Sequence, residues 1–302
     1  MAGPFFIPDL SSWQGNLPDF DAIAARPDMV GCIIKSSQGL GPGVSPQRGH
    51  ALTFFRDNWP RVAAAGGERY GSTWFRGLYH FATPNSSGTE QADHVLATVD
   101  RAGGWGAGDL PPAWDLEGNE WTSKQQVIDL SAQFAERIYS QLGRRAILYT
   151  GSTWRKFGIT DRAGFGSLWT PHMDVMARYG WPNETIVLHQ YVGTGKYYNR
   201  SSEPARLGYP TSIEGISGID MNVVLDGGVP ATSIERVQQI FTGTNDLTQA
   251  LPATAPSEAP SAPADRGDSI GFLSTPVLIG IGAVGLLAIG IAIASSSGDD
   301  TP

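Results

Sequence analysis

The sequence predicts an α/β barrel, followed by a C-terminal linker and a single transmembrane helix. Two observations predict the barrel: eight short apolar runs recur over about 225 residues, and several intervals between them have helical periodicity. An uncharged apolar stretch near the C-terminus predicts the transmembrane helix. The alternative to the barrel is a doubly wound open sheet. It is disfavoured because no glycine-rich phosphate loop follows the first run.

The eight apolar runs are the expected strands, and alternation with helices favours a parallel sheet. They cover residues 4–10, 29–37, 76–83, 111–116, 145–151, 167–170, 185–192 and 216–224. Residues 52–66 and 123–143 have apolar side chains at three- and four-residue spacing and are expected helices. Ser123 is the expected N-cap of the second helix, and Gly143 ends it. Beyond about residue 151 loops replace obvious helices, until a final helix over residues 232–241.

Composition excludes some classes of protein. The net charge of −8 and the pI of about 5.1 disfavour a nucleic-acid binder, which would show a basic face. Cys32 is the only cysteine, so the chain has neither an internal disulfide nor a cysteine-based metal site. Nothing in the sequence calls for a cofactor.

The chain is expected to have four parts. These are a globular part over 1–242, a Pro/Ala/Ser-rich linker over 243–271, a transmembrane helix over 272–294 and a polar tail over 295–302. The N-terminus lacks a basic region and a long apolar core, so no signal peptide is expected. The positive-inside rule weakly favours the globular part on the cytoplasmic side.

The run at 111–116 ends in two acids that lie two residues apart. Asp115 and Glu117 therefore point to one face of the strand, while Trp114 and Leu116 point to the other, towards a helix layer. Active sites of parallel barrels lie at the carboxyl ends of the strands, where this pair is found.

Two further acids are expected at the same place. Asp9 ends the first run, and Asp220 shares a face with Asn222 near the end of the last. Because the first and last strands of a closed barrel adjoin, Asp9 and Asp220 are expected to lie close together. Four carboxylates would then converge on one pocket.

Such a cluster suits glycosidic bond cleavage. Repulsion raises the pKa of at least one acid, which can protonate the leaving oxygen while another stabilises the oxocarbenium-like centre. The other interpretations are a salt bridge, with Lys35 as counter-ion, and a divalent-cation site. His80 and His189 alternate away from the acids, so no metal site is predicted. Tyr79 and Phe81 share a face and suit the apolar face of a sugar.

Six motifs occur in an informative order. They are DLSSWQG at 9–15, IIKSSQG at 33–39, GLYHFA at 77–82, DLE at 115–117, LYTG at 148–151 and GIDMN at 218–222. In this order the chain resembles glycoside hydrolase family 25, the Chalaropsis-type lysozymes (N-acetylmuramidases) of fungi, bacteria and phage endolysins. The resemblance implies a modified TIM-like barrel of eight strands with about five helices.

The resemblance also implies residue roles. Glu117 matches the general acid, Asp115 the carboxylate that assists the anomeric centre, and Asp9 and Asp220 the remaining acids of the pocket. The expected substrate-binding residues are Tyr79, Phe81, Gln190, Tyr191 and Asn222. Leu188 departs from the family pattern, in which an aromatic residue is common there.

We therefore expect a cofactor-free lysozyme that cleaves the β-1,4 bond between N-acetylmuramic acid and N-acetylglucosamine of bacterial peptidoglycan. We expect it to be a phage lysin, for host lysis or wall entry, associated with the host membrane through its C-terminal helix or carried in a virion. The alternative is a catalytically silent wall-binding or virion module on the same barrel. A glycosidase of another polysaccharide is a third interpretation.

Overall fold

The computed structural model describes the part of the chain that contains the predicted barrel. The described residues are 3–15, 18–41, 51–118, 120–171, 180–192, 207–213, 216 and 218–242. They all belong to the first of two compact units, Met1–Ala250 and Leu251–Pro302. The predicted linker, transmembrane helix and tail over 243–302 lie outside the described residues. Among the residues that are described, no helix is long and apolar enough to cross a membrane.

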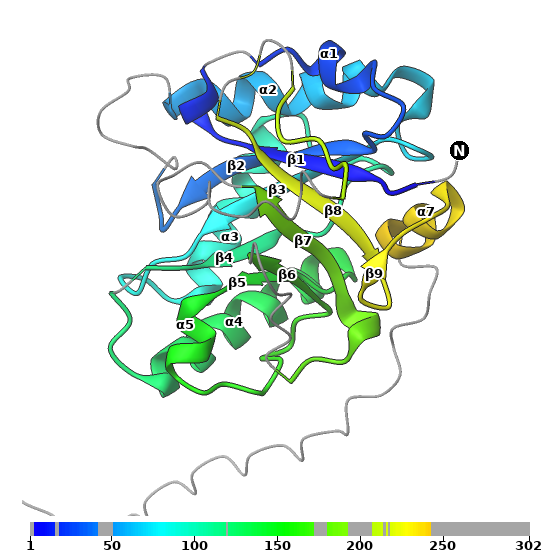
Figure 1. Ribbon diagram of the computed structural model, residues 1–302. Helices are drawn as coiled ribbons and strands as arrows, with labels where there is room; N and C mark the ends of the chain where they lie inside the picture. The colour runs from blue at the N-terminus through cyan, green and yellow to red at the C-terminus, as the bar shows by residue number, and fades with distance from the viewer. Residues whose placement is uncertain are drawn as a thin grey trace, which may run out of the picture. The chain divides into compact units, whose positions relative to one another are not determined.

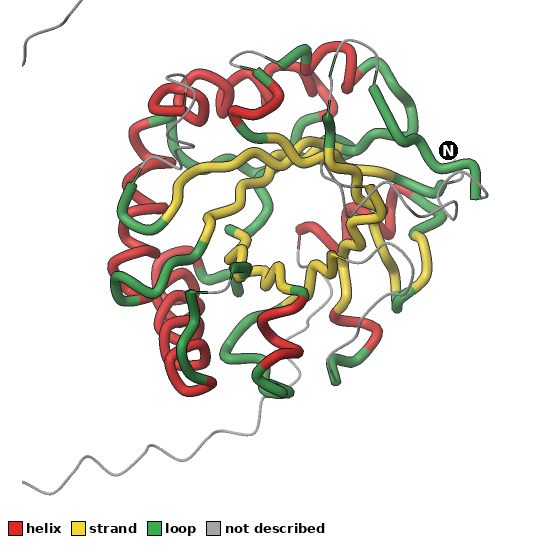
Figure 2. The backbone as a smooth tube through the Cα atoms, turned by 60° about the vertical axis from the view of Figure 1, so that its left-hand side comes forward, coloured by secondary structure: helices red, strands yellow, loops and turns green. Residues whose placement is uncertain are grey.

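Eight strands close into a barrel, as Figure 2 shows from one end. Neighbours in sequence are neighbours in the sheet from β1 to β8, and β8 also pairs with β1. The closed barrel is therefore confirmed, and the open sheet is excluded. The strands are β1 (Phe6–Leu10), β2 (Gly31–Gln38), β3 (Phe75–Phe81), β4 (Ala113–Leu116), β5 (Ile147–Thr150), β6 (Ser167–Pro171), β7 (Ile186–Val192), β8 (Asp220–Asp226) and the short β9 (Val229–Pro230) that pairs with β8.

The prediction of a parallel sheet is wrong for the last strand. Pairs from β1–β2 to β6–β7 are parallel, but β8 is antiparallel to both β7 and β1. The chain enters β8 at the same end of the barrel at which it leaves β7. A connection of this kind makes the two strands antiparallel. Asp220 is therefore the first residue of its strand and not close to the end. Asp220 still lies at the end of the barrel where the other acids are expected, because the start of an antiparallel strand lies beside the ends of its parallel neighbours.

Helices pack around the outside of the barrel (Figures 1 and 2). Six α-helices lie within the described residues, against about five implied by the resemblance. They are α1 (Phe20–Ala24), α2 (Ala51–Gly66), α3 (Gly88–Arg101), α4 (Lys124–Leu142), α5 (Ser152–Lys156) and α7 (Ile234–Thr242), with short 3₁₀ turns η1 (Ser12–Gln14), η2 (Gly67–Arg69) and η3 (Asn183–Thr185). Both predicted caps of α4 are confirmed. The Ser123 hydroxyl accepts from the Gln126 amide at 3.1 Å, and Gly143 adopts φ of 64°.

Alternation along the strands separates two hydrophobic layers. Trp114 and Leu116 point outward and pack under the helices, as predicted, in the larger outer core. The barrel interior is filled by a second cluster. Its floor is closed by α7, where the rings of Phe75 and Phe241 meet edge to face at 5.1 Å. The floor end is thus apolar and sealed, which leaves the opposite end for polar side chains.

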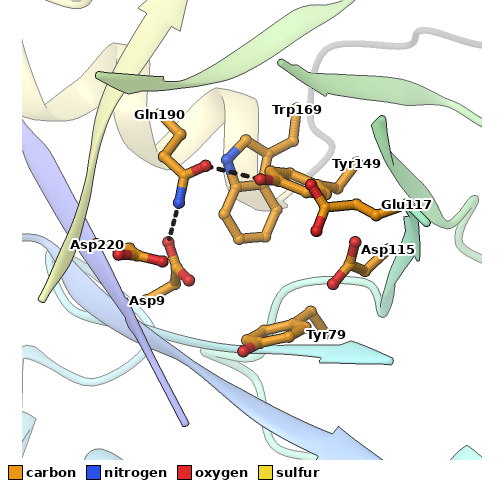
Figure 3. A pocket seen from close by; sticks show the side chains of 8 residues that line it. All are labelled: Asp9, Tyr79, Asp115, Glu117, Tyr149, Trp169, Gln190 and Asp220. Carbon is orange, nitrogen blue, oxygen red and sulfur yellow. Dashed lines mark hydrogen bonds between the residues drawn. The ribbon is translucent and has the colours of Figure 1, made fainter. Parts of the chain in front are cut away.

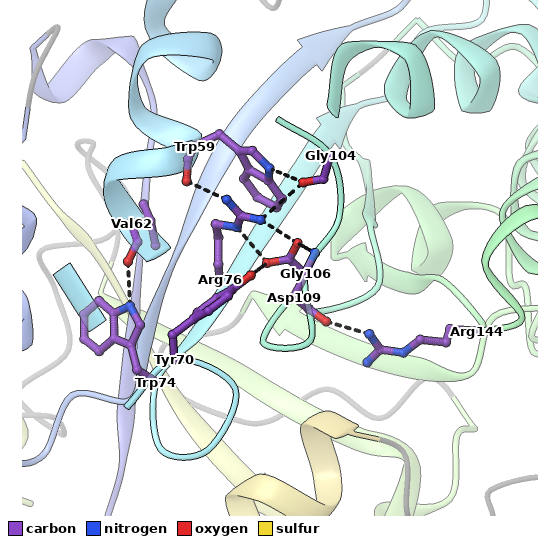
Figure 4. Close-up of polar contacts among 9 residues, drawn as sticks. All are labelled: Trp59, Val62, Tyr70, Trp74, Arg76, Gly104, Gly106, Asp109 and Arg144. Carbon is purple, nitrogen blue, oxygen red and sulfur yellow. Dashed lines mark hydrogen bonds and ion pairs between the residues drawn. The ribbon is translucent and has the colours of Figure 1, made fainter. Parts of the chain in front are cut away.

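A buried ion pair fixes the amino end of β3, on the sealed side of the barrel (Figure 4). Arg76 donates to both carboxylate oxygens of Asp109, at 2.6 and 2.7 Å, and its guanidinium stacks 3.7 Å from the Trp59 ring. The Tyr70 hydroxyl and the Gly106 amide complete the partners of the carboxylate. Each buried charge therefore has the full set of partners that burial requires.

Candidate active site

Four acids and four other polar or aromatic side chains line a pocket at the carboxyl end of the parallel strands. The lining residues are Asp9, Tyr79, Asp115, Glu117, Tyr149, Trp169, Gln190 and Asp220. The predicted convergence of the four carboxylates is confirmed. Figure 3 shows Asp9 and Asp220 on one side of the pocket, and Asp115 and Glu117 on the other.

Strand register explains how residues distant in sequence meet. Asp9 is the register partner of Asp220 across β1 and β8. Asp115 pairs with Tyr149 on β5, which in turn pairs with Trp169 on β6. Side chains at one register level of a barrel point inward together, so these residues form one layer.

Hydrogen bonds hold Asp9 in a fixed orientation. Its Oδ2 accepts from Asn222 Nδ2 at 2.9 Å and from Gln190 Nε2 at 3.4 Å. Asn222 also donates to the Ile7 carbonyl, and its Oδ1 accepts from Trp169 Nε1 at 2.7 Å. These bonds lower the pKa of Asp9, but burial and then the charge of Asp220 dominate and raise it well above its ordinary value.

Asp115 and Glu117, which lie across the pocket from Asp9 and Asp220, also hold their protons more strongly than ordinary carboxyls do. Burial is the main cause that raises the pKa of Asp115 well above its ordinary value, and repulsion from Glu117 adds to it. Burial raises the pKa of Glu117 as well, with Asp220 adding to the shift. Glu117 is half-buried whereas Asp115 is 5% exposed, so Glu117 is the more accessible of the two.

Lys35 is the cation of the site. Its Nζ lies 4.9 Å from the centre of the Phe81 ring and donates to Gln38 at 3.2 Å. Its charge lowers the pKa of Asp115 and of Glu117. Burial lowers the pKa of Lys35 itself, and the two acids oppose this shift. Lys35 therefore offsets part of the negative charge of the pocket, which is consistent with the counter-ion interpretation.

Only two of the five predicted substrate-binding residues line the pocket. Tyr79 and Gln190 do, whereas Phe81 is covered by Lys35 and Asn222 is fully buried behind Asp9. Tyr191 lies on the outer face of β7, where its hydroxyl donates to the Pro210 carbonyl at 2.7 Å and its ring packs against Phe6. Consecutive residues of a strand point to opposite faces, so Gln190 and Tyr191 cannot share one pocket.

Sequence reasoning missed Tyr149 and Trp169 as lining residues. Both lie on strands that were predicted, and alternation from buried neighbours could have placed them inward. Trp169 packs edge to face against Tyr149 at 4.7 Å and against Tyr79 at 6.4 Å. The three rings form an aromatic wall suited to the apolar face of a sugar.

His80, which alternation turns away from the acids, makes structural contacts outside the pocket. His80 lies under the helix layer, where it bonds Ser37 at 2.8 Å and Gln91 at 3.0 Å and stacks against both Trp114 and Phe134. Burial lowers its pKa to about 3, so the ring is neutral at ordinary pH. Within the described residues, no group of three or more His, Cys, Asp or Glu side chains could hold a metal ion.

A closed barrel with carboxylates and aromatic rings gathered at the carboxyl ends of its strands defines the class as a barrel of the glycoside hydrolase type. The model of glycosyl hydrolases family 25 matches residues 8–199, and the chain belongs to this family.

Two relatives and one solved structure that are similar to this chain are a lysozyme, a muramidase and a bacterial lysozyme. Lysozyme M1 of Streptomyces globisporus is 28% identical over 203 residues, 62% of each chain. The N,O-diacetylmuramidase of Arthroderma benhamiae is 33% identical over 130 residues, 37% of this chain and 53% of that protein. The chain thus spans about half to three fifths of the length of these two relatives. The crystal structure of a bacterial lysozyme from Streptomyces coelicolor is 25% identical, with a TM-score of 0.58 over 80% of this chain and 99% of that one.

Proposed function

We propose that the protein is a peptidoglycan hydrolase that cleaves the β-1,4 bond between N-acetylmuramic acid and N-acetylglucosamine. The observation that carries the proposal is the convergence of four carboxylates on one pocket walled by aromatic rings. Such a cluster is costly to bury, and a module that only binds has no need of it. Membership of glycosyl hydrolases family 25 and similarity to a lysozyme and a muramidase support the same reaction.

Glu117 donates the proton. It is the more accessible acid of its pair, and burial keeps its pKa above the ordinary value, so it can be protonated when the substrate arrives. As the bond between the anomeric carbon and the leaving oxygen breaks, the oxygen takes the proton of Glu117 and keeps the bonding electrons. A water molecule then adds to the anomeric carbon, and a proton returns to Glu117.

Asp115 stabilises the positive charge that develops on the sugar. It lies deeper than Glu117, and its Oδ1 is buried without a hydrogen-bond partner among the described residues. That oxygen is therefore available to the anomeric carbon as a nucleophile, or to the N–H of the 2-acetamido group of the substrate. Asp9 and Asp220 tune the protonation of the facing pair and bind the sugar.

Turbidity loss of purified peptidoglycan tests the function, with Glu117→Gln as the variant. We expect the wild type to clear the wall and the variant to be about 10²–10⁴-fold slower, the usual contribution of a general acid. Mass spectrometry of the fragments should show reducing-end N-acetylmuramic acid. Equal clearing by both proteins would refute the catalytic assignment. No clearing by either would favour the silent wall-binding module, and a different reducing end would point to another glycosidase.

We also propose that residues 272–294 anchor the protein in a membrane. The stretch is uncharged and as a helix would be about 34 Å long at ~1.5 Å per residue, enough for a hydrocarbon core of about 30 Å. Residues 243–271 would allow a reach on the order of 9 nm when extended. The host membrane and the virion are the two predicted locations. The role of a phage lysin stays a prediction.

Fractionation tests the anchor. The double variant Val284→Arg and Leu287→Arg places two charges in the apolar stretch, each of which opposes insertion by about 3 kcal/mol. We expect the wild type in the membrane fraction and the double variant in the supernatant. Thr254→Arg, in the predicted linker, is the control and should stay with the membrane. An unchanged distribution of the double variant would contradict anchoring.

A further inference from the structure

We propose that Tyr149 is a positioning residue for the proton donor, with a hydroxyl that changes partner during the reaction. It donates to Gln190 while Glu117 carries the proton, and it donates to Glu117 once the proton has left. The proposal rests on the function above, in which Glu117 is the general acid.

The contacts of Tyr149 supply both positions. Its hydroxyl donates to Gln190 Oε1 at 2.7 Å, and Figure 3 shows Glu117 beside Tyr149 on the same side of the pocket. A side-chain hydrogen bond from Tyr149 also lowers the pKa of Glu117. The ring is 7% exposed and is held edge to face by Trp169. The ring is therefore fixed, and the hydroxyl proton is the part that can move.

A hydroxyl has one proton to donate and can accept from another group. When Glu117 is protonated, its O–H can donate to Tyr149, which donates to Gln190, whose Nε2 donates to Asp9 at 3.4 Å. This chain of donors ends on a carboxylate. When Glu117 is ionised, the hydroxyl turns to the new charge, and a hydrogen bond to a charged acceptor is stronger than one to a neutral amide.

The hydrogen bond from Tyr149 to ionised Glu117 is stronger than the one to Gln190. This difference sets the direction in which Tyr149 shifts the pKa of Glu117. The bond from Tyr149 lowers the pKa of Glu117, against burial and the charge of Asp220, which raise it. Tyr149 therefore stabilises the carboxylate that proton transfer leaves behind. Without it the donor would hold its proton more strongly and release it more slowly.

Other charged and titratable groups face the same carboxylate. They are Asp115 beside it, Lys35 from β2, Tyr79 from β3, Asp9 from β1 and Asp220 from β8. Substitution of Tyr149 or Gln190 retains all of them. Tyr149→Phe removes only the hydroxyl, whereas Gln190→Leu removes the amide that accepts from it and also the bond from that amide to Asp9.

The test is the pH dependence of wall clearing by the full chain, carrying Tyr149→Phe or Gln190→Leu. In Tyr149→Phe the basic limb, which reports loss of the Glu117 proton, should move up by about one pH unit, and kcat should fall about tenfold. In Gln190→Leu the hydroxyl no longer donates to the amide, which favours its bond to Glu117, so the basic limb should move down. Tyr139→Phe, on the exposed face of α4, is the control and should match the wild type.

Opposite shifts in the two variants support the proposal. Shifts in one direction, or none, overturn it even if the wild type clears the wall. A merely structural role of Tyr149 would change KM, kcat or stability and leave the limbs in place. If a variant is too slow to assay, a carboxyl-carbon NMR titration of Glu117 must show the same opposite shifts. That titration needs no turnover, so it tests the hydroxyl separately from the proposed reaction.

Discussion

Asp9 and Asp220 face each other as register partners across β1 and β8, where the barrel closes. Two carboxylates at adjoining positions repel each other, and burial removes the water that would screen them. The pKa of Asp9 is raised well above its ordinary value by burial first and by Asp220 second. The pairing of β1 with β8 therefore brings two repelling carboxylates together, which lowers the stability of the fold.

The first prediction follows from this opposition. The folded-state pKa of Asp9 lies above the unfolded value near 3.8, so its contribution to stability is complete below that pH and is lost as the pH rises through the folded pKa. Asp9→Asn should therefore raise the free energy of unfolding at pH 7 by about 1 kcal/mol, and the gain should vanish near pH 3. Urea denaturation at several pH values measures it. Asp129→Asn, on the exposed surface of α4, is the matched control substitution.

A second prediction concerns the amide that holds Asp9. Asn222 is fully buried and bonds Asp9, Ile7 and Trp169. Asn222→Leu would leave these partners without it, so we expect a loss of about 2–4 kcal/mol in the free energy of unfolding. The pKa of Asp9 should rise further, because its hydrogen bond from Asn222 is gone. A loss below about 0.5 kcal/mol would show that the network contributes little.

A third prediction compares two arginine–aspartate pairs of different burial. Arg76→Met leaves the Asp109 carboxylate buried without its counter-ion, which should cost about 3–5 kcal/mol. Arg137→Met breaks the exposed pair with Asp93 and should cost less than about 1 kcal/mol. Thermal and urea unfolding measure both. Neither change should shift the pH profile of activity, since Arg76 lies on the sealed side of the barrel.

A fourth prediction tests the position of Tyr191 outside the pocket. Tyr191→Phe removes the bond to Pro210 and retains the ring contacts with Phe6 and Tyr209. We expect KM and kcat within about twofold of the wild type, and a loss of about 1 kcal/mol in stability. A large rise in KM with unchanged stability would restore Tyr191 to the substrate site.

Much of the barrel could be predicted because strand alternation and short apolar runs are local signals. Asp115 and Glu117 were predicted to point inward from their spacing alone, and Trp114 to point outward. The direction of β8 could not be predicted, because it depends on the end of the barrel at which the chain enters this strand. Hydrophobic periodicity does not encode that choice. Alternation could have placed Tyr149 inward, but its contacts with Gln190 on β7 and Glu117 just after β4 could not be predicted, because these residues meet only through strand register. The linker and transmembrane helix over 243–294 stay predictions.

The closure of the barrel by β8 also has a consequence for the synthesis of the protein. Asp9 leaves the ribosome more than two hundred residues before Asp220, its register partner. A nascent chain that stops before β8 contains Asp9, Asp115 and Glu117 but lacks Asp220 and the strand that closes the barrel. The cell that makes this chain would therefore not meet a finished site until translation of the barrel is almost complete.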